Sequence, residues 1–336
     1  MNIIFSEGSG LNDSIFGKWQ APISMFLEKR GEAFEQKSML GEFFVMGKSD
    51  NFADTFTGLT AMSGFKPVGE NGEYPADGMQ EGYKKMLEYP EWKDSFAISQ
   101  KMAEDAKLVD IERKSAGFMN AFGRTRERFG AALYGGAIAG KSSIAFEGMQ
   151  FDITGADGQP LFSTSHKPMV SGEVQSNLFS NEFSAEALDM AEAAMHQFRG
   201  DNNEVLDVAP VTIAIPDIPA LKRKVFAVIG ADLDPNSANH GYNFQYGRWN
   251  VKIWTYLNQF VAKGVEPWML LDDDYNKFNR GAVWNDRVPL TVRSELASND
   301  ANVWKGRARW GACFNDFRFA CLGGITGGTD LTTLKI

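Results

Sequence analysis

Four short stretches of the sequence, of three kinds, contain residue types that could perform chemistry. The first, residues 135–142, reads Gly-Gly-Ala-Ile-Ala-Gly-Lys-Ser and formally matches the phosphate-binding pattern G-x-x-x-x-G-K-[ST]. Such a loop binds phosphate when it follows a buried strand and opens a helix, because backbone N–H groups then face the anion. Here a long helical pattern precedes the stretch and a strand-like segment, 143–146, follows it. This order of elements predicts the C-terminal end of a helix, closed by glycine. The alternative is the phosphate-binding loop of a nucleotide-binding enzyme.

The second stretch, residues 163–166, places serine and threonine hydroxyls beside the imidazole of His166. A serine becomes a nucleophile when a base removes its proton in an enforced geometry, which residues adjacent in sequence rarely achieve. The other two histidines, His196 and His240, have no metal-ligand partner at i+3 or i+4. We therefore expect no catalytic centre and no enzyme activity.

The third kind of stretch is acidic, at residues 232–236 and 272–274. Neither has the glycine at the sixth loop position or the glutamate at the twelfth that a calcium-binding loop uses. Both are expected to be solvated turns, so the sequence predicts no metal and no cofactor. Cys313 and Cys321 would lie about 26 Å apart on one extended strand, so buried, reduced thiols are expected.

Composition favours a folded chain with a large core. It has 336 residues, 43% of them hydrophobic, with 26 Phe and 8 Trp, and this content argues against disorder. The net charge of −9 argues against nucleic-acid binding by charge alone, although a weak phosphate contact on one basic face stays open. No apolar run approaches about 18 residues and residues 1–11 lack a leader pattern, so neither a membrane span nor an export signal is expected.

The elements that must position these residues are organised around a helical pattern over residues 100–134. Apolar side chains recur there at intervals of three and four, on one stripe of a helix. A helix from 101 to 133 would be about 50 Å long, so we expect it to pack on distant parts of this chain or on other chains. Gly117, Gly123 and Gly130 suggest close packing or a bend. The side chains expected to pack this spine helix are Ile111, Phe118, Phe122, Phe129 and Leu133.

Residues 55–97 have the composition of an extended loop, because glycine and proline recur through most of it. Asn71-Gly72 is a favoured two-residue hairpin turn, since both positions need positive φ. The segment has too few core residues to fold alone, so it needs another surface to lie on.

The remaining segments mix strands and helices without a strict βαβ order, which makes the fold class α+β. Helices are predicted at 23–34, at 184–198 with Ser184 as N-cap, and at 219–228 with Gly230 behind it. Strands are predicted at 143–146, 149–153, 211–215, 251–256, 268–271, 288–292, 305–313 and 317–322.

This order of elements (an arm, a hairpin loop, a spine helix and an α+β body whose last strands return) resembles the Hong Kong 97 fold of tailed-bacteriophage major capsid proteins. The middle of the chain, about residues 159–271, is similar to the Mu-type major head subunit family. The stretches that carry this similarity are Pro160-Leu-Phe-Ser-Thr-Ser-His166, Ser176-Asn-Leu178, the helix after Ser184, Val211-Thr-Ile-Ala-Ile-Pro216 and Pro267-Trp-Met-Leu-Leu271.

The resemblance implies a major capsid protein that assembles into hexamers and pentamers and forms an icosahedral shell around double-stranded DNA. The alternative is an encapsulin-like protein compartment of the same fold. The implied division is an N-terminal arm (1–54), an extended loop (55–97), a peripheral domain with the spine helix (98–183), an axial domain (184–284) and returning peripheral strands (285–336). The side chains expected to contact neighbouring subunits are Phe56, Phe65, Tyr74, Tyr83, Tyr89 and Trp92.

The resemblance also implies partners: other copies of the chain, a portal, packaged DNA held non-specifically on the inner face, and in some members a decoration protein. Residues 1–51 are too short for a scaffold-type N-terminal domain, which favours a separate scaffolding protein. The expected location is the virion capsid, assembled in the host bacterial cytoplasm. No motif around Lys66, Lys84 or Lys85 identifies a reactive pair, so no cross-linking chemistry is carried over.

Overall fold

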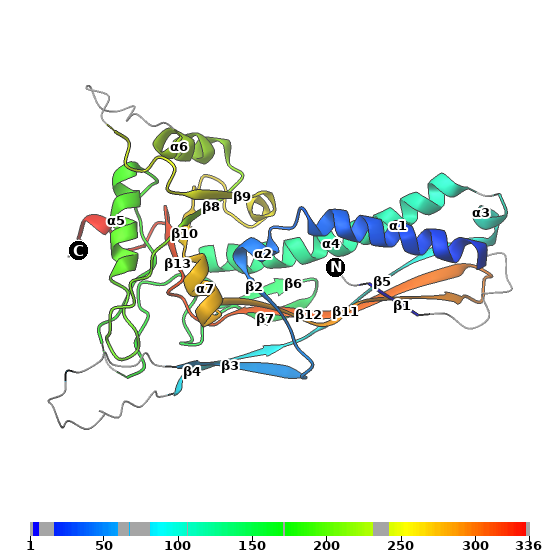
Figure 1. Ribbon diagram of the computed structural model, residues 1–336, viewed down its shortest axis with the longest axis horizontal. Helices are drawn as coiled ribbons and strands as arrows, with labels where there is room; N and C mark the ends of the chain where they lie inside the picture. The colour runs from blue at the N-terminus through cyan, green and yellow to red at the C-terminus, as the bar shows by residue number, and fades with distance from the viewer. Residues whose placement is uncertain are drawn as a thin grey trace. The chain divides into compact units, whose positions relative to one another are not determined.

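Two compact units, each built from separate pieces of the chain, make up the α+β structure (Figure 1). The computed structural model describes residues 3–6, 17–59, 67, 81–105, 107–170, 172–230 and 242–333. The first unit is assembled from Met1–Asp54, Leu87–Gly130 and Trp284–Ala312, and the second from Thr55–Met86, Ala131–Val283 and Cys313–Ile336. Segments far apart in the sequence therefore share each core.

A five-stranded sheet forms much of the first unit. Its strands are β1 (Ile4–Ser6), β2 (Val45–Lys48), β5 (Glu91–Ile98), β11 (Ala282–Leu296) and β12 (Asn302–Phe314). The order is β1-β11-β12-β5, with β2 also paired to β11. Strand β5 is antiparallel to β12, with Ile98 opposite Asn302 and Glu91 opposite Arg309. Residues 91–97, which the expected division placed in the extended loop, thus belong to this sheet.

The helices of the first unit are α1 (Gly17–Glu35), α2 (Leu40–Phe43), α3 (Gln100–Glu104) and the part of α4 (Leu108–Ile138) up to Gly130. The prediction of a single helix over residues 100–134 was wrong, because the helix is interrupted between α3 and α4. At this break the N–H of Lys107 donates to the carbonyl of Met102, five residues back, at 3.1 Å, which widens the turn and ends the regular ladder. With 31 residues, α4 is about 46 Å long.

Aromatic rings fill the space between α4 and the sheet. Trp92 stacks on Trp310 with ring centroids 4.7 Å apart, and Phe129 meets Trp92 edge-on at 5.5 Å. Phe118 reaches the sheet at Gly306, where a Cβ atom would lie 2.3 Å from the Cζ atom of the ring. Because such ring pairs attract beyond their burial, the aromatic layer holds this part of α4 against the sheet.

A four-stranded sheet lies at the centre of the second unit. Its strands are β8 (Thr212–Pro216), β9 (Asn250–Trp254), β10 (Trp268–Leu271) and β13 (Ala320–Gly323). The order is β13-β10-β8-β9, with β10 antiparallel to both neighbours and β8 parallel to β9. Strands β8, β10 and β13 are buried along their whole length, as the continuous apolar sequence of β10 predicts.

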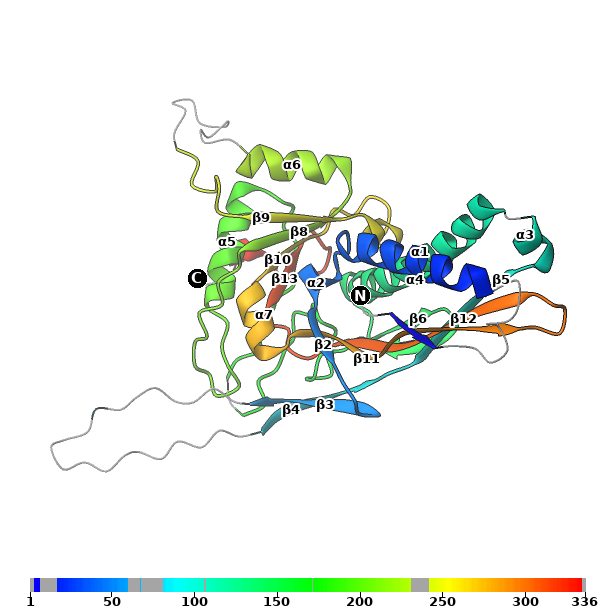
Figure 2. The same ribbon diagram turned by 45° about the vertical axis from the view of Figure 1, so that its right-hand side comes forward.

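The second unit also contains α5 (Ala185–His196), which precedes β8, α6 (Pro219–Ile229), which follows β8, and α7 (Asp273–Asn279), which follows β10. Ser184 caps α5 as predicted, its hydroxyl oxygen accepting from the N–H of Ala187 at 3.1 Å. Figure 2 shows α6 lying along β8 and β9, and its buried Leu221 and Val225 share a core with Ile213. The expectation of a solvated turn at 272–274 was wrong, since Asp272 is buried and caps α7.

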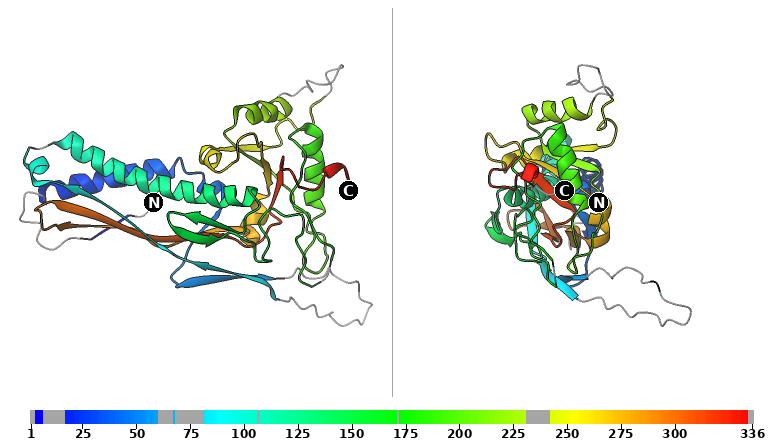
Figure 3. Two further views of the ribbon diagram at one scale, coloured as in Figure 1. Left: turned by 180° about the vertical axis from the view of Figure 1, so that it is seen from behind. Right: turned by 90° about the vertical axis from the view of Figure 1, so that its left-hand side faces the viewer.

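Two hairpins and two short 3-10 turns complete the described chain. Strands β3 (Ala53–Leu59) and β4 (Glu81–Glu88) pair as a ribbon, and β6 (Ser143–Phe146) pairs with β7 (Met149–Asp152). The β6–β7 hairpin lies beside the end of α4 in Figure 3, where Gly136 leaves room for Ile144. The predicted Asn71-Gly72 turn lies outside the described residues. The 3-10 turns are Thr255–Gln259 and Leu331–Thr333. Within the described residues, no helix has the length and apolar character that crossing a membrane requires.

Candidate assembly surfaces

The five side chains predicted to pack the spine helix all lie on α4. Ile111, Phe129 and Leu133 have no exposed surface and Phe118 is 6% exposed, whereas Phe122 is half-buried and meets Trp310 edge-on at 5.4 Å. Leu133 belongs to the second unit and the other four to the first. The stripe seen in the sequence is therefore the buried face of α4.

Two of the glycines in this helix have different surroundings. A Cβ atom at Gly123 would lie 2.4 Å from the ring of Phe34 in α1, so close packing was predicted correctly there. At Gly117 nothing lies within 4 Å of that position, so no close packing is found there. The small size of Gly123 is therefore required for the contact between α1 and α4.

A buried polar cluster ties the start of β3 and the end of β4 to β11 within the first unit. The hydroxyl of Tyr89 donates to Asp54, and the amide of Asn285 donates to Asp54 at 3.1 Å and to the Tyr89 oxygen at 3.0 Å. Burial raises the pKa of Tyr89 to about 12, helped by the Asp54 carboxylate. Burial also opposes ionisation of Asp54, but its hydrogen bonds outweigh that effect and keep its pKa below the usual value. Sequence spacing gives no signal for this cluster.

A second anchor holds the ribbon within the second unit. The ammonium of Lys85 on β4 is buried and lies 2.7 Å from the carboxylate of Asp152 and 3.1 Å from the hydroxyl of Thr154. The Asp152 carboxylate gains more from these hydrogen bonds than burial costs it, so its pKa is lowered. Further along, the hydroxyl of Tyr83 donates to the carbonyl of Lys167 at 3.4 Å. The described part of the ribbon is therefore docked on its own chain.

The side chains predicted to contact neighbouring subunits are distributed unevenly. Phe56 and Tyr89 are 8% and 2% exposed, so their own chain already covers them. Tyr83 and Trp92 are half-buried. Phe65 and Tyr74 lie outside the described residues. Contact of these six side chains with a neighbouring subunit therefore stays a prediction. Among the described residues, the exposed parts of Tyr83 and Trp92 are available for such a contact.

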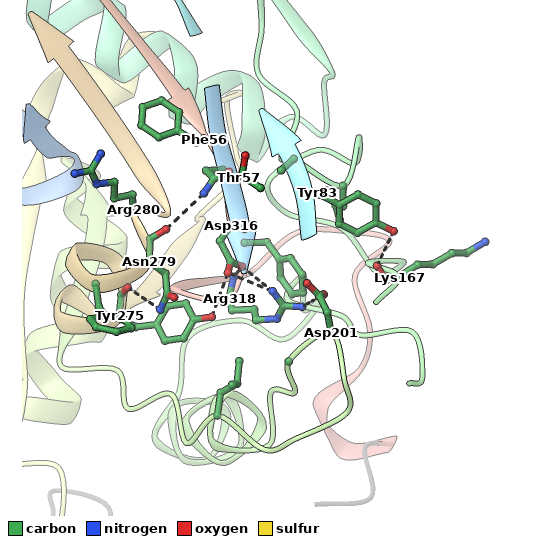
Figure 4. A pocket seen from close by; sticks show the side chains of 18 of the residues that line it. Phe56, Thr57, Tyr83, Lys167, Asp201, Tyr275, Asn279, Arg280, Asp316 and Arg318 are labelled. Atoms are coloured by element: carbon green, nitrogen blue, oxygen red, sulfur yellow. Dashed lines mark hydrogen bonds and ion pairs between the residues drawn. The ribbon is translucent and has the colours of Figure 1, made fainter. Parts of the chain in front are cut away.

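A cavity of about 820 Å³ opens in the second unit beside α7 and β3 (Figure 4). At its floor the guanidinium of Arg318 donates to Asp201 at 2.7 Å, to Asp316 at 3.2 Å and to the carbonyl of Arg199 at 2.8 Å. Tyr275 donates to Asp316 at 3.1 Å. Although burial alone would lower the pKa of Arg318, the two carboxylates outweigh it and raise that pKa above its usual value. The network is a structural floor in which one guanidinium serves two carboxylates.

The wall of the same cavity contains Asp157 and Phe317, which both contact His166. The ring of His166 is fully buried and stacks on Phe317 with centroids 3.7 Å apart. Its Nδ1 atom lies 2.6 Å from Asp157 and its Nε2 atom 3.1 Å from the side-chain oxygen of Asn177. Both ring nitrogens therefore contact partners other than Ser163 and Ser165, whose hydroxyls bond to each other at 3.2 Å. The arrangement is structural and does not form a nucleophile pair.

The stretch that matches the phosphate-loop pattern is a helix end, as its order predicted. Helix α4 continues to Ile138, and Gly140 follows with φ +64°. The N–H of Lys141 bonds back to the carbonyl of Gly136 at 3.0 Å. These bonds satisfy the last carbonyls of the helix, so the backbone there presents no helix N-terminus to an anion.

The two cysteines are buried and neither forms a disulfide, as expected. Burial raises the pKa of the Cys321 thiol to about 12, which disfavours the reactive thiolate at neutral pH.

No family model matches the sequence, and no curated protein matches it. Among solved structures, the chain is similar to the capsid of Ralstonia phage GP4, with a TM-score of 0.51 at 11% identity over 87% of this chain and 93% of that chain. It also matches a chain of Mycobacterium phage Bobi (TM-score 0.46, 11% identity, 87% and 91% covered) and a virus-like particle from Pyrococcus furiosus (0.48, 9%, 89% and 98%). At such low identity these matches describe the fold alone. The first establishes that this chain has the Hong Kong 97 fold of phage capsid proteins, with the α+β class predicted from the sequence.

Proposed function

We propose that this chain is a major capsid protein, which assembles into hexamers and pentamers that close an icosahedral head around the double-stranded DNA of a tailed phage. The observation that carries this proposal is the structural similarity to the Ralstonia phage capsid, which spans 87% of the chain and nearly all of the capsid chain. A shell of repeated copies is stable because weak contacts act together once the assembly closes.

Within this class, the finer assignment is the Mu-type major head subunit family. It is supported by the short stretches between residues 160 and 271, which run from the loop before His166 to strand β10. The partners of this assignment are a separate scaffolding protein, a portal, DNA on the inner face and, in some shells, a decoration protein. Assembly takes place in the host bacterial cytoplasm.

The proposed division of labour follows the predicted segments. The arm (1–54) and the extended loop (55–97), apart from the residues of β5 that pair with β12, reach neighbouring copies, while the peripheral domain (98–183 with 285–336) and the axial domain (184–284) build the capsomer. The loop has the composition of a segment without a core of its own, which is the property expected of a part that lies on another chain.

Negative-stain electron microscopy tests the proposal on the chain produced alone and with the products of its neighbouring genes. Closed shells, or rings of five and six copies, are expected in at least one condition. A persistent folded monomer in both would refute a capsid function. Nuclease-protected DNA inside the shells identifies a genome container, whereas protein cargo without DNA identifies the encapsulin-like alternative.

A variant that lacks residues 64–78 provides the matched control. Circular dichroism should show the same folded content as the complete chain, because the deletion removes no described strand or helix. Shells should be lost. Normal shells from this variant would refute the role given to the loop while leaving the capsid function intact.

A further inference from the structure

His166 lies in a buried polar site where both of its ring nitrogens face oxygen atoms. Its side chain has no exposed surface, and that of Asp157 is 8% exposed. The Nδ1 atom lies 2.6 Å from a carboxylate oxygen of Asp157, and the Nε2 atom lies 3.1 Å from the side-chain oxygen of Asn177. A neutral imidazole has one N–H group and can donate only one hydrogen bond. The number of protons on this ring therefore depends on whether both oxygens are acceptors.

The orientation of the Asn177 amide is fixed by backbone groups that cannot exchange the roles of donor and acceptor. Its NH2 group donates to the carbonyl of Leu161 at 2.8 Å and to that of Ala320 at 3.0 Å. Its oxygen accepts from the backbone N–H of Ser163 at 2.9 Å. A reversed amide would place its oxygen against two carbonyls and its NH2 group against an N–H, and these three bonds would be lost. The atom that faces Nε2 is therefore an oxygen, which can only accept.

The acceptor on the other side of the ring is the carboxylate of Asp157. One of its oxygens accepts from the backbone N–H of Gln159 at 3.1 Å, and the other faces Nδ1. Because imidazole is a much stronger base than a carboxylate in water, a proton between these two groups belongs to the ring. Acceptors at both nitrogens thus require the doubly protonated, cationic form of His166.

The immediate surroundings of the ring are suited to a buried positive charge. A buried cation loses its hydration, and an ion pair with good hydrogen-bond geometry offsets that loss. Asp157 provides such a pair at Nδ1. The ring of His166 also stacks on Phe317 with centroids 3.7 Å apart and an angle of 4° between the planes, and the face of an aromatic ring attracts a cation.

The other charged groups around this site are engaged elsewhere. The guanidinium of Arg318 is paired with Asp201 and Asp316, as Figure 4 shows. The side chain of Lys167, which follows His166 in the sequence, is exposed. Among the described residues, the carboxylate that serves the imidazole ring is therefore the one at Nδ1.

We propose that His166 is a buried proton-binding site, whose ring carries a proton on both nitrogens at pH 7 and thereby locks three segments of the second unit together. One N–H ties the ring to the turn at Asp157. The other ties it to Asn177, whose amide also holds the carbonyl of Ala320 at the start of β13. Loss of one proton breaks one of these bonds and leaves a nitrogen lone pair against an oxygen, which weakens the lock.

The bound proton makes the stability of the second unit depend on pH. A histidine in an unfolded chain releases this proton near about pH 6.5. Below that pH both states hold the proton, and the contribution of the lock is fully present. Above it the folded chain holds one proton more than the unfolded chain, so stability falls as the pH rises. The equilibrium constant for unfolding should increase by up to about tenfold per pH unit until the folded ring also loses its proton.

The first experiment observes the ring nitrogens directly by NMR of the full-length chain labelled with ¹⁵N-histidine at pH 7. The chain has three histidines, so the signals that persist in both His196→Gln and His240→Gln belong to His166. Two nitrogens with nearly equal chemical shifts, each with one attached hydrogen, are expected. A bare Nδ1 would place the proton on Asp157, and a bare Nε2 would leave the oxygen of Asn177 without this donor; either result overturns the proposal. In Asp157→Asn, Nδ1 should become bare, because the new amide can donate to it.

The second experiment follows urea denaturation of the unassembled full-length chain at several pH values from 6.5 to 9. The unfolding equilibrium constant of the natural chain should rise with pH, and His166→Gln should lose up to about tenfold of this rise per pH unit. His196→Gln is the matched control, because it makes the same substitution in the same unit at a ring that is 36% exposed and lies 3.0 Å from Asp207. It should keep the slope of the natural chain. A slope that is unchanged in His166→Gln would overturn the proposal. Neither experiment involves shells, so the proposed capsid function is tested separately.

Discussion

Replacing Arg318 tests whether the floor of the cavity is held by charge pairing. The side chains of Arg318, Asp201 and Asp316 are 11%, 11% and 16% exposed, so solvent screens their interactions weakly. Arg318→Met keeps most of the side-chain volume but leaves two buried carboxylates without their cation. Removing one member of a buried ion pair typically costs about 3–5 kcal/mol, and here one cation serves two carboxylates. We expect the free energy of unfolding to fall by about 4 kcal/mol, measured by urea denaturation followed by circular dichroism.

The control removes the charges on both sides. In the triple variant Arg318→Met, Asp201→Asn, Asp316→Asn, no buried charge remains, so most of the lost stability should return. Arg318→Lys should lie between the two, because an ammonium keeps the charge but cannot reach both carboxylates and the carbonyl of Arg199 together. A loss below about 1 kcal/mol for Arg318→Met, or a triple variant no better than the single one, would show that the network does not depend on charge.

Three further predictions follow from the anchors described above. Tyr89→Phe should cost about 1–3 kcal/mol of unfolding free energy, because the half-buried Asp54 loses the donor that the buried Tyr89 supplies. Tyr83→Phe, with its 3.4 Å bond at a half-buried site, should cost less than about 0.5 kcal/mol, and equal losses would contradict the role of the cluster of Asp54, Tyr89 and Asn285. The pKa of Asp152 is lowered in the folded chain. Its ionised form therefore stabilises the fold above the unfolded pKa of about 4, and this contribution is lost as the pH falls below that value. Asp152→Asn should consequently lose less thermal stability than the natural chain on acidification from pH 6 to pH 3. Gly306→Ala should destabilise the chain by about 1–3 kcal/mol through the ring of Phe118. Gly117→Ala, where the space is open, should instead gain up to about 1 kcal/mol of unfolding free energy, and an equally large loss there would show that lack of space does not explain the effect at Gly306.

Local sequence signals predicted the elements that depend on local physics. Ser184 caps α5, Gly230 follows α6, and the apolar run at 268–271 is the buried strand β10, each at the predicted position. Hydrophobic periodicity also identified the buried face of α4. These features are set by neighbours within one or two turns of chain, so spacing alone contains them.

Features that depend on distant partners could not be predicted in this way. The interruption between α3 and α4 leaves the apolar spacing intact, so periodicity does not mark it. Asp272 belongs to an acidic run that suggests solvent, but its carboxylate also accepts from the N–H of Ala209 at 2.8 Å, 63 residues away. Likewise, Arg318 and Asp201 are 117 residues apart, and nothing in the sequence pairs them. Long-range hydrogen bonds require the fold before they can be recognised.

The first unit is built from three separate pieces of the chain, and this has a consequence for synthesis on the ribosome. Its core needs Trp304 and Trp310, which belong to the last of its three pieces, Trp284–Ala312. The face of α4 that those rings cover therefore stays open until residue 312 has left the ribosome, because strands distant in sequence pair late. A chain whose translation stops before residue 312 therefore cannot complete this core.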